Sequence, residues 1–170
     1  MHPTMTTTPP DIHWTWCRFP DLGLQDLYDL LQLRARVFIL EQGPYLDPDG
    51  LDQHSWHLLG RLGHDWNGLP AGELVLYLRA VDPGLKYEEP ALGRVVNHPA
   101  VRGLGLGRVL VGEGVRRCDL TWPGQPNRIS AQAHLADFYG GFGYRPVGEV
   151  YLEDDIHHQE MLRPCQAPAV

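Results

Sequence analysis

The chain has 170 residues, a length that suits one domain. Hydrophobic residues make up 43% and charged residues 21%, which excludes both a disordered chain and a membrane-embedded one. The net charge of -7 argues against a broad surface for nucleic acid or anionic membranes, so we expect neither partner.

The cysteines indicate a cellular compartment, and the composition of the chain ends indicates where the domain begins and ends. Three cysteines are widely spaced and form no CxxC pair, which is typical of a reducing compartment, and we expect a cytoplasmic location. Residues 1–10, rich in Thr and Pro, have neither the basic nor the apolar segment of a signal peptide. We therefore expect a disordered tail over 1–10, one domain over 11–165, and a short tail over 166–170.

The first half of the chain predicts mainly strands. We expect them over residues 12–18, 57–62, 73–81 and 91–97. Apolar residues at helical spacing predict one amphipathic helix from Leu24 to Phe38, which Gly43-Pro44 closes. The pair Asn67-Gly68 predicts a hairpin turn between the second and third strands.

The second half alternates helices with strands. We expect a helix after residue 107, a strand over 128–133, a short helix over 135–142, and strands over 144–151 and 159–163. Strands followed by alternating helices and strands predict an α/β fold with a mixed sheet. Cys118, at the end of an apolar helical pattern, is expected in the core.

A glycine-rich segment, RGLGLG over residues 102–107, separates the strand ending at Asn97 from the following helix. Glycines allow close backbone approach, and the first amides of a helix have no intrahelical partner and lie at its positive end. Such a loop suits a pyrophosphate, and Arg102 adds a positive charge. The segment matches neither the P-loop nor the dinucleotide fingerprint.

This loop, placed after a strand and His98-Pro99, resembles motif A of the GNAT (Gcn5-related) N-acetyltransferases. Residues 134–144, HLADFYGGFGY, resemble motif B of the same family. Blocks over 33–52, 93–96, 129–134 and 148–154 resemble its ElaA-type branch, so that the resemblance covers residues 14–163. Two positions depart from the branch pattern, namely Gly43, where Cys is usual, and His157, where Pro is usual.

The resemblance implies a mixed, mostly antiparallel, twisted sheet flanked by helices and splayed at the strand that binds acetyl-CoA. It also implies acetyl-CoA as co-substrate, a small-molecule or peptide amine as acceptor, and a possible homodimer through the last strands. The implied cofactor-binding residues are Val95, Val96 and Asn97 for the pantetheine arm, and Arg102, Gly103, Leu104, Gly105, Leu106 and Gly107 for the pyrophosphate.

Direct acetyl transfer to an amine needs a base for the amine proton and an acid for the leaving thiolate. The resemblance places Tyr139 near the CoA sulfur, as the general acid. Glu153 and His158, in a run of titratable groups, are candidates for the base, unless that run is only a solvated turn. Glu41 is the third candidate, unless it merely caps its helix or pairs with Arg36 or Arg94.

Other functions are weaker candidates. No HExxH or CxxC motif accompanies the histidines, and adjacent histidines in a strand point to opposite faces, so we expect no metal site. An acyl-CoA-binding sensor or partner module without turnover is the main alternative to an enzyme. A nucleotide-binding protein of another kind is the third possibility. The motifs do not identify the amine acceptor.

Overall fold

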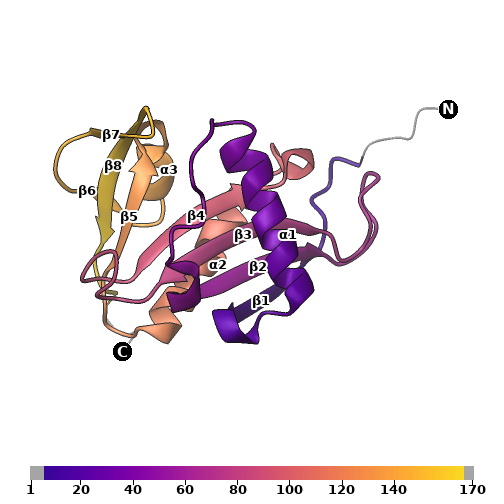
Figure 1. Cartoon of the computed structure of the whole chain (residues 1–170), viewed down its shortest axis with the longest axis horizontal. Coiled ribbons are helices and arrows are strands. Elements are labelled where there is room, and N and C mark those ends of the chain that lie inside the picture. Colours follow the sequence, from indigo (N-terminus) through magenta and orange to yellow (C-terminus); the bar gives the residue numbers. More distant parts are fainter. Residues whose placement is uncertain (1–5, 167–170) are drawn as a thin grey trace.

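The computed structural model describes residues 6–166, which form one mixed α/β layer structure (Figure 1). Eight strands share one sheet in the order β1-β2-β3-β4-β5-β8-β6, with β7 paired to β8. The strands are β1 (Ile12–Arg18), β2 (Ser55–Leu62), β3 (Leu74–Val81), β4 (Ala91–Asn97), β5 (Asn127–Gln132), β6 (Arg145–Pro146), β7 (Tyr151–Glu153) and β8 (Ile156–Arg163). All strand pairs except β4–β5 are antiparallel, which confirms the predicted fold class.

Two helices cover opposite faces of the sheet (Figure 1). Helix α1 (Leu24–Arg34) continues into a π-helical turn (Ala35–Ile39), so the predicted helix forms but changes its winding after Arg34. Helix α2 (Leu106–Thr121) covers the other face and buries Cys118, as predicted. A Cβ at Gly114 would lie 2.6 Å from Leu78 Cδ2, so glycine permits close contact between α2 and β3.

The first four strands form an antiparallel meander. The predicted turn between β2 and β3 is present, with φ 44° at Asn67 and 86° at Gly68. Positive φ at both central residues is the geometry of a type I′ turn, which matches the twist of paired strands. Strand β3 is buried along its whole length because α1 and α2 cover both of its faces.

The sheet splays between β4 and β5. These parallel strands are in register only at Ala91 and Arg128, whereas β5 and β8 pair from Asn127 to Gln132. On its other side β4 has a bulge, because Tyr77 is opposite Val96 and Arg79 is opposite Gly93. Arg94, within the bulge, has a φ of 51°. The splay predicted at this strand is therefore confirmed.

The C-terminal part departs from the prediction. The expected strand over 144–151 divides into β6 and β7, because Gly148 between them has a φ of 75° and cannot continue an extended strand. The side-chain amide of Gln159 donates to the carbonyl groups of Val147 and Gly148 and holds this loop. Strand β8 begins at Ile156, three residues before the predicted start, and α3 (Ala136–Gly140) is shorter than the predicted helix.

The described part of the N-terminal segment has no helix or strand, but it contacts the domain. The backbone of Thr6 hydrogen-bonds the Asn67 side chain, and Trp66 Nε1 donates to the carbonyl oxygen of Thr8. The predicted tails over 1–5 and 167–170 lie outside the described residues. Among the helices of residues 6–166, none combines the length and the hydropathy that a bilayer crossing needs.

Candidate functional site

A cavity of about 550 Å³ opens where β4 and β5 diverge. Its walls come from β3, β4, β5, α3 and the β7–β8 hairpin, together with the loops before β2 and before β4. The predicted site residues that line it are Val95, Val96, Asn97, Arg102, Tyr139, Glu153 and His158. The fold thus brings together residues that are up to 63 positions apart in the chain, from Val95 to His158.

The glycine loop presents unpaired amides at the start of α2. Gly103 and Gly105 have φ of 78° and 75°, which L side chains rarely adopt. Among residues 6–166, no carbonyl or side chain accepts a hydrogen bond from the amides of residues 103–107. Five such amides at the positive end of a 16-residue helix form a site suited to an anion.

Strand β4 and the glycine loop meet closely beside this cavity. A Cβ at Gly107 would lie 3.2 Å from the Asn97 side-chain nitrogen, so the start of α2 lies against the end of β4. Beyond Ala91, no residue of β4 is in register with β5, and the β4 backbone on that side is free to bond an extended ligand. The two predicted parts of the cofactor site are therefore adjacent.

Tyr139 lies in α3 at the cavity wall. Its ring packs edge-on against Phe138 and Tyr144, with ring centroids 5.1 Å and 6.1 Å away. Burial raises the pKa of Tyr139 to about 12, because the phenolate would lose its hydration. Among the described residues its hydroxyl has no hydrogen-bond partner, so a protonated phenol remains available to a ligand.

His158 and Glu153 face one another across the β7–β8 hairpin. His158 Nδ1 lies 2.8 Å from the carbonyl oxygen of Ile156, which can only accept, so this nitrogen carries the proton. When the other nitrogen, Nε2, carries no proton it is an acceptor, and it lies 3.8 Å from Glu153 Oε2. The Ser130 hydroxyl donates to the same carboxylate at 3.4 Å. The Ile156 carbonyl thus orients the ring, and His158 Nε2 and the Glu153 carboxylate are two neighbouring proton acceptors.

Glu41 lies elsewhere. Its carboxylate lies 3.0 Å from Arg102 of the glycine loop. The non-catalytic alternative had predicted an ion pair with Arg36 or Arg94 instead. Both side chains are partly exposed, and Glu41 is not among the residues that line the cavity. The structure therefore groups Glu41 with the loop that is expected to hold pyrophosphate, and not with Tyr139.

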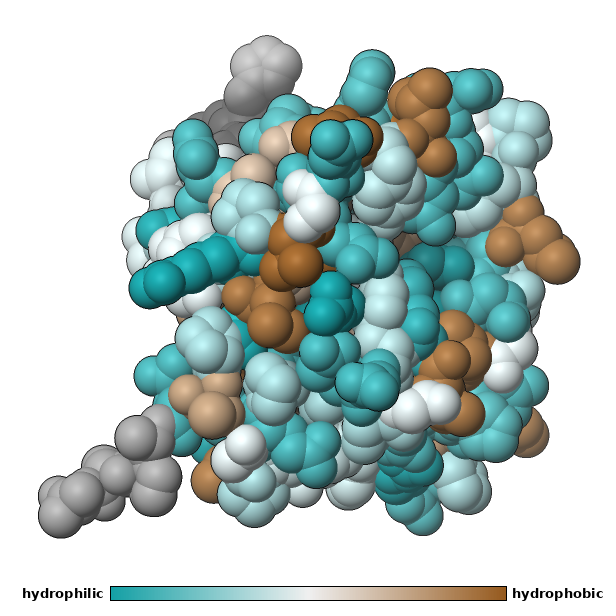
Figure 2. Space-filling model, turned by 90° about the vertical axis from the view of Figure 1, so that its left-hand side faces the viewer, coloured by the Kyte–Doolittle hydropathy of each residue, from teal (hydrophilic) through white to brown (hydrophobic). Residues whose placement is uncertain are grey.

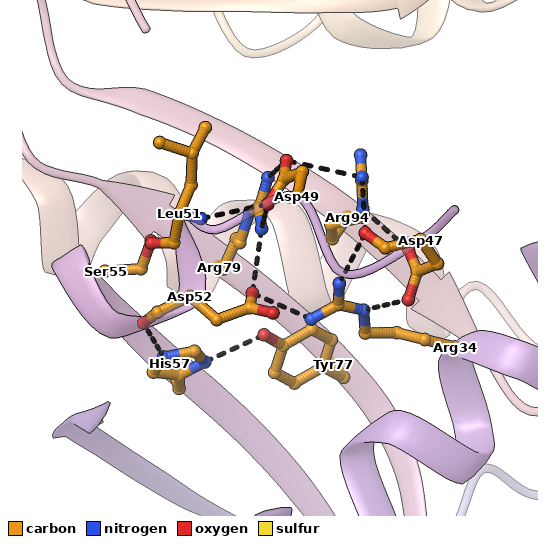
Figure 3. A network of polar contacts seen from close by, with 10 residues as sticks. All are labelled: Arg34, Asp47, Asp49, Leu51, Asp52, Ser55, His57, Tyr77, Arg79 and Arg94. Atoms are coloured by element: carbon orange, nitrogen blue, oxygen red, sulfur yellow. Dashed lines mark hydrogen bonds and ion pairs between the residues drawn. The ribbon is translucent and has the colours of Figure 1, made fainter. Parts of the chain in front are cut away.

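A buried ionic network that the sequence analysis missed supports one wall of the cavity (Figure 3). It joins three arginines from three different elements to three aspartates of the loop before β2: Arg34, Arg79 and Arg94 with Asp47, Asp49 and Asp52. Arg34 is fully buried and binds Asp47 and Asp52, each at 2.8 Å. Arg79 Nη1 lies 2.7 Å from Asp52.

Arg79 keeps Asp49 of the network in its carboxylate form. Burial acts to raise the pKa of Asp49, but the hydrogen bonds and charge of Arg79 outweigh it and hold that pKa well below its usual range. At one end, the His57 ring lies between Tyr77 Oη at 2.8 Å and the carbonyl oxygen of Asp52 at 2.9 Å. Burial lowers the pKa of His57, which keeps the ring neutral.

The sequence held two signals for this network. The aspartates fall in the block that resembles the ElaA-type branch, and Arg79 lies two residues after Tyr77 on the same face of a buried strand. Of the other histidines considered, His54 and His157 are exposed. Within residues 6–166, no group of three or more His, Cys, Asp or Glu side chains is arranged to hold a metal ion.

Comparison with known proteins agrees with this geometry. Residues 81–163 match the family model described as an acetyltransferase (GNAT) domain. A UPF0039 protein of Synechocystis is 41% identical over 153 residues, which cover 89% of this chain and 95% of the relative. Protein ElaA of Escherichia coli is 40% identical over 155 residues, covering 89% and 96%.

Solved structures give the same result. The crystal structure of an acyl-CoA N-acyltransferase from Pseudomonas aeruginosa has a TM-score of 0.81 and 42% identity, and covers 90% of this chain and 99% of its own. That of Escherichia coli ElaA has a TM-score of 0.79 and 39% identity, with the same coverage. The splayed sheet, the glycine loop and this likeness along most of its length show that the chain belongs to the ElaA branch of the GNAT acyltransferases.

Proposed function

We propose that this protein is an N-acetyltransferase that moves the acetyl group of acetyl-CoA to a primary amine by direct attack within a ternary complex. The observation that carries the proposal is the row of unpaired amides over 103–107, adjacent to the cavity at the splay. Membership of an acyl-CoA-dependent family supports it. We expect the reaction to take place in the cytoplasm and to need no metal.

Backbone groups of two segments bind acetyl-CoA, the acetyl donor. The pyrophosphate binds the amides of Gly103, Leu104, Gly105, Leu106 and Gly107, with Arg102 as a neighbouring cation. The pantetheine arm extends along β4 and bonds the backbone of Val95, Val96 and Asn97, in the position that a further strand would take. The thioester then lies in the cavity, within reach of Tyr139.

The chemical step needs two proton transfers. The neutral amine attacks the thioester carbon, a C–N bond forms, and the C–S bond breaks. Tyr139, whose raised pKa keeps it protonated, gives its proton to the departing thiolate. The amine proton passes, through water, to a base. Holding donor and acceptor together supplies much of the rate.

For the base we favour His158 with Glu153, because His158 Nε2 is an acceptor and both side chains line the cavity. Glu153 can also act alone, since its carboxylate is half exposed. Glu41 is the third candidate, but its carboxylate is held by Arg102 and has to leave that ion pair first.

The test is calorimetric titration with acetyl-CoA, with CoA, NAD and ATP as controls, followed by a screen of amines. We expect acetyl-CoA to bind in the micromolar range and NAD and ATP not to bind. Absence of acetyl-CoA binding would refute the assignment of the glycine loop. Binding without acetylation of any amine would instead favour a sensor or partner module.

A homodimer is a second expectation, which the resemblance implies for the last strands. Figure 2 shows apolar side chains set among polar ones on the side of the molecule where β6–β8 lie. Val147, Val150 and Leu152 are exposed there. Sedimentation equilibrium measures the mass, and a monomer at high protein concentration would contradict the expectation.

A further inference from the structure

Lys86 is the only lysine of the chain, and it lines the cavity. It lies in the loop between β3 and β4, with its Nζ 5.6 Å from the centroid of the Tyr87 ring. The Lys86 side chain is exposed to solvent and forms part of the cavity wall. A lysine in this position is a mobile cation with three hydrogen-bond donors.

The other cations of the cavity wall already have carboxylate partners. Arg79 binds Asp49 and Asp52, Arg94 binds Asp47 and Asp49, and Arg102 binds Glu41. No carboxylate among residues 6–166 forms an ion pair with Lys86. Of the wall cations within residues 6–166, Lys86 is therefore the one whose charge is left for a ligand.

Acidic groups line another part of the same cavity. Glu153 and Asp154 lie at the tip of the β7–β8 hairpin, and Asp154 has no ion-pair partner among the described residues. Burial lowers the pKa of Lys86, and the charge of Glu153 acts to raise it, so the two groups lie within electrostatic range without touching. Among the described residues that line the cavity, Lys86 therefore has no carboxylate partner, and Glu153 and Asp154 lie apart from it.

We infer that the acceptor amine also carries a carboxylate, which Lys86 binds, while the amine lies towards Glu153 and His158. A purely cationic acceptor, such as a polyamine, would bring like charge close to Lys86. An acceptor with a carboxylate at its other end pairs with both walls and is held in one direction. This inference rests on the proposed function and adds the substrate class to it.

The test compares amines in matched pairs with acetyl-CoA saturating. Each pair has an amino acid with its α-, β- or γ-amino group and the corresponding carboxamide, which has the same size but no negative charge. We expect the acid to be preferred in kcat/KM by at least about tenfold, the size of one charge-assisted contact. In Lys86→Met the preference falls to about twofold or less, and in Lys86→Arg most of it is kept.

Arg145→Met is the matched control. Arg145 is exposed in β6 and has no ion pair among the described residues, so this variant removes one positive charge away from the cavity and keeps the preference for the acid. A wild-type enzyme that acetylates acids and carboxamides equally, or a Lys86→Met variant that keeps the preference, would overturn the inference. A stronger preference for an amine with a phosphate group would overturn the inference that the acceptor carries a carboxylate.

Two further outcomes separate this inference from the proposed function. If acetyl-CoA binds but only amines without a carboxylate are acetylated, the substrate class is wrong and the proposed function stands. If the protein itself gains one acetyl group at Lys86, detected by mass spectrometry, this side chain is an acceptor and its recognition role is refuted. Absence of acetyl-CoA binding refutes the proposed function and, with it, this inference.

Discussion

Tyr139 is the side chain at which chemistry and binding can be separated. Replacing it by Phe removes one hydroxyl and keeps the ring that packs on Phe138 and Tyr144. We expect Tyr139→Phe to lower kcat by about 100-fold or more, in the range of a lost general acid. The Kd for acetyl-CoA, measured by calorimetry, should stay within about twofold.

The matched control is Tyr144→Phe. The Tyr144 hydroxyl donates to Asn127 at 2.6 Å in the core and does not line the cavity. Its loss should lower the free energy of unfolding and leave kcat near the wild-type value. Equal turnover of wild type and Tyr139→Phe would remove Tyr139 from the mechanism.

The glycine loop offers a second test at the scale of single residues. Gly105 and Gly124 have nearly equal φ, 75° and 76°, and at both an added Cβ would meet no atom within 4 Å. Asp tolerates this backbone better than most residues, so both Gly→Asp variants should fold. We expect Gly105→Asp to weaken acetyl-CoA binding at least about tenfold, because its carboxylate repels the pyrophosphate.

Gly124→Asp adds the same charge beyond the other end of α2 and should leave acetyl-CoA binding unchanged. The comparison is made by calorimetry, with thermal unfolding to check that both variants are folded. Similar loss of binding in both variants would show that net charge, rather than the loop, sets the affinity.

At the scale of elements, the loop before β2 depends on its arginines. Removing Arg79 leaves Asp49 and Asp52 with fewer partners in a buried site. Because an uncompensated buried charge is costly, we expect Arg79→Met to lower the free energy of unfolding by about 3–5 kcal/mol, measured with urea at neutral pH.

Arg116→Met is the control for this prediction. Arg116 pairs with Glu113 one turn earlier on the exposed side of α2, where solvent screens the interaction. Its urea midpoint should stay close to that of the wild type. An Arg79→Met variant as stable as Arg116→Met would mean that the network adds no net stability.

The elements themselves were largely predictable, and their local geometry explains the exceptions. Periodicity and turn residues were sufficient for β1–β4, α2 and the Asn67-Gly68 hairpin. The strand expected over 144–151 failed because alternation does not reveal that Gly148 takes a positive φ. The π-helical turn after Arg34 was equally hidden, because apolar spacing from Leu24 to Phe38 predicts a helix but does not specify its winding.

For the site, the sequence indicated which residues to consider but not their tertiary partners. The motifs and the family resemblance supplied Val95 to Gly107, Tyr139, Glu153 and His158. The ionic network was missed because three arginines on separate elements become neighbours only when the sheet and α1 pack together. The predicted ion-pair partners of Glu41, Arg36 and Arg94, were wrong for the same reason.

At the scale of the whole molecule, two buried histidines should make the free energy of unfolding depend on pH. His57 and His98 have folded-state pKa values that burial lowers below the unfolded value, near ~6.5. As the pH falls through that unfolded value, the unfolded chain takes up protons first, and the free energy of unfolding falls. We expect a decrease of at most about 1.4 kcal/mol per pH unit for each histidine between about pH 6.5 and 5.

Urea unfolding at several pH values tests this prediction. His57→Gln should show a smaller decrease than the wild type, because Gln keeps polar contacts beside Tyr77 but does not titrate. The control, His64→Gln, alters an exposed histidine and should keep the wild-type slope. A wild-type slope in His57→Gln would show that the buried ring has no part in the pH dependence.

The single register pair between β4 and β5 has a consequence for hydrogen exchange. Apart from Ala91 and Arg128, the two halves of the sheet are joined by side-chain packing rather than by a ladder. The β4 amides that face β5 should therefore exchange with deuterated water faster than those bonded to β3. Because the pantetheine arm is expected to bond that same edge, adding acetyl-CoA should slow the exchange of these β4 amides and so identify the residues that bind it.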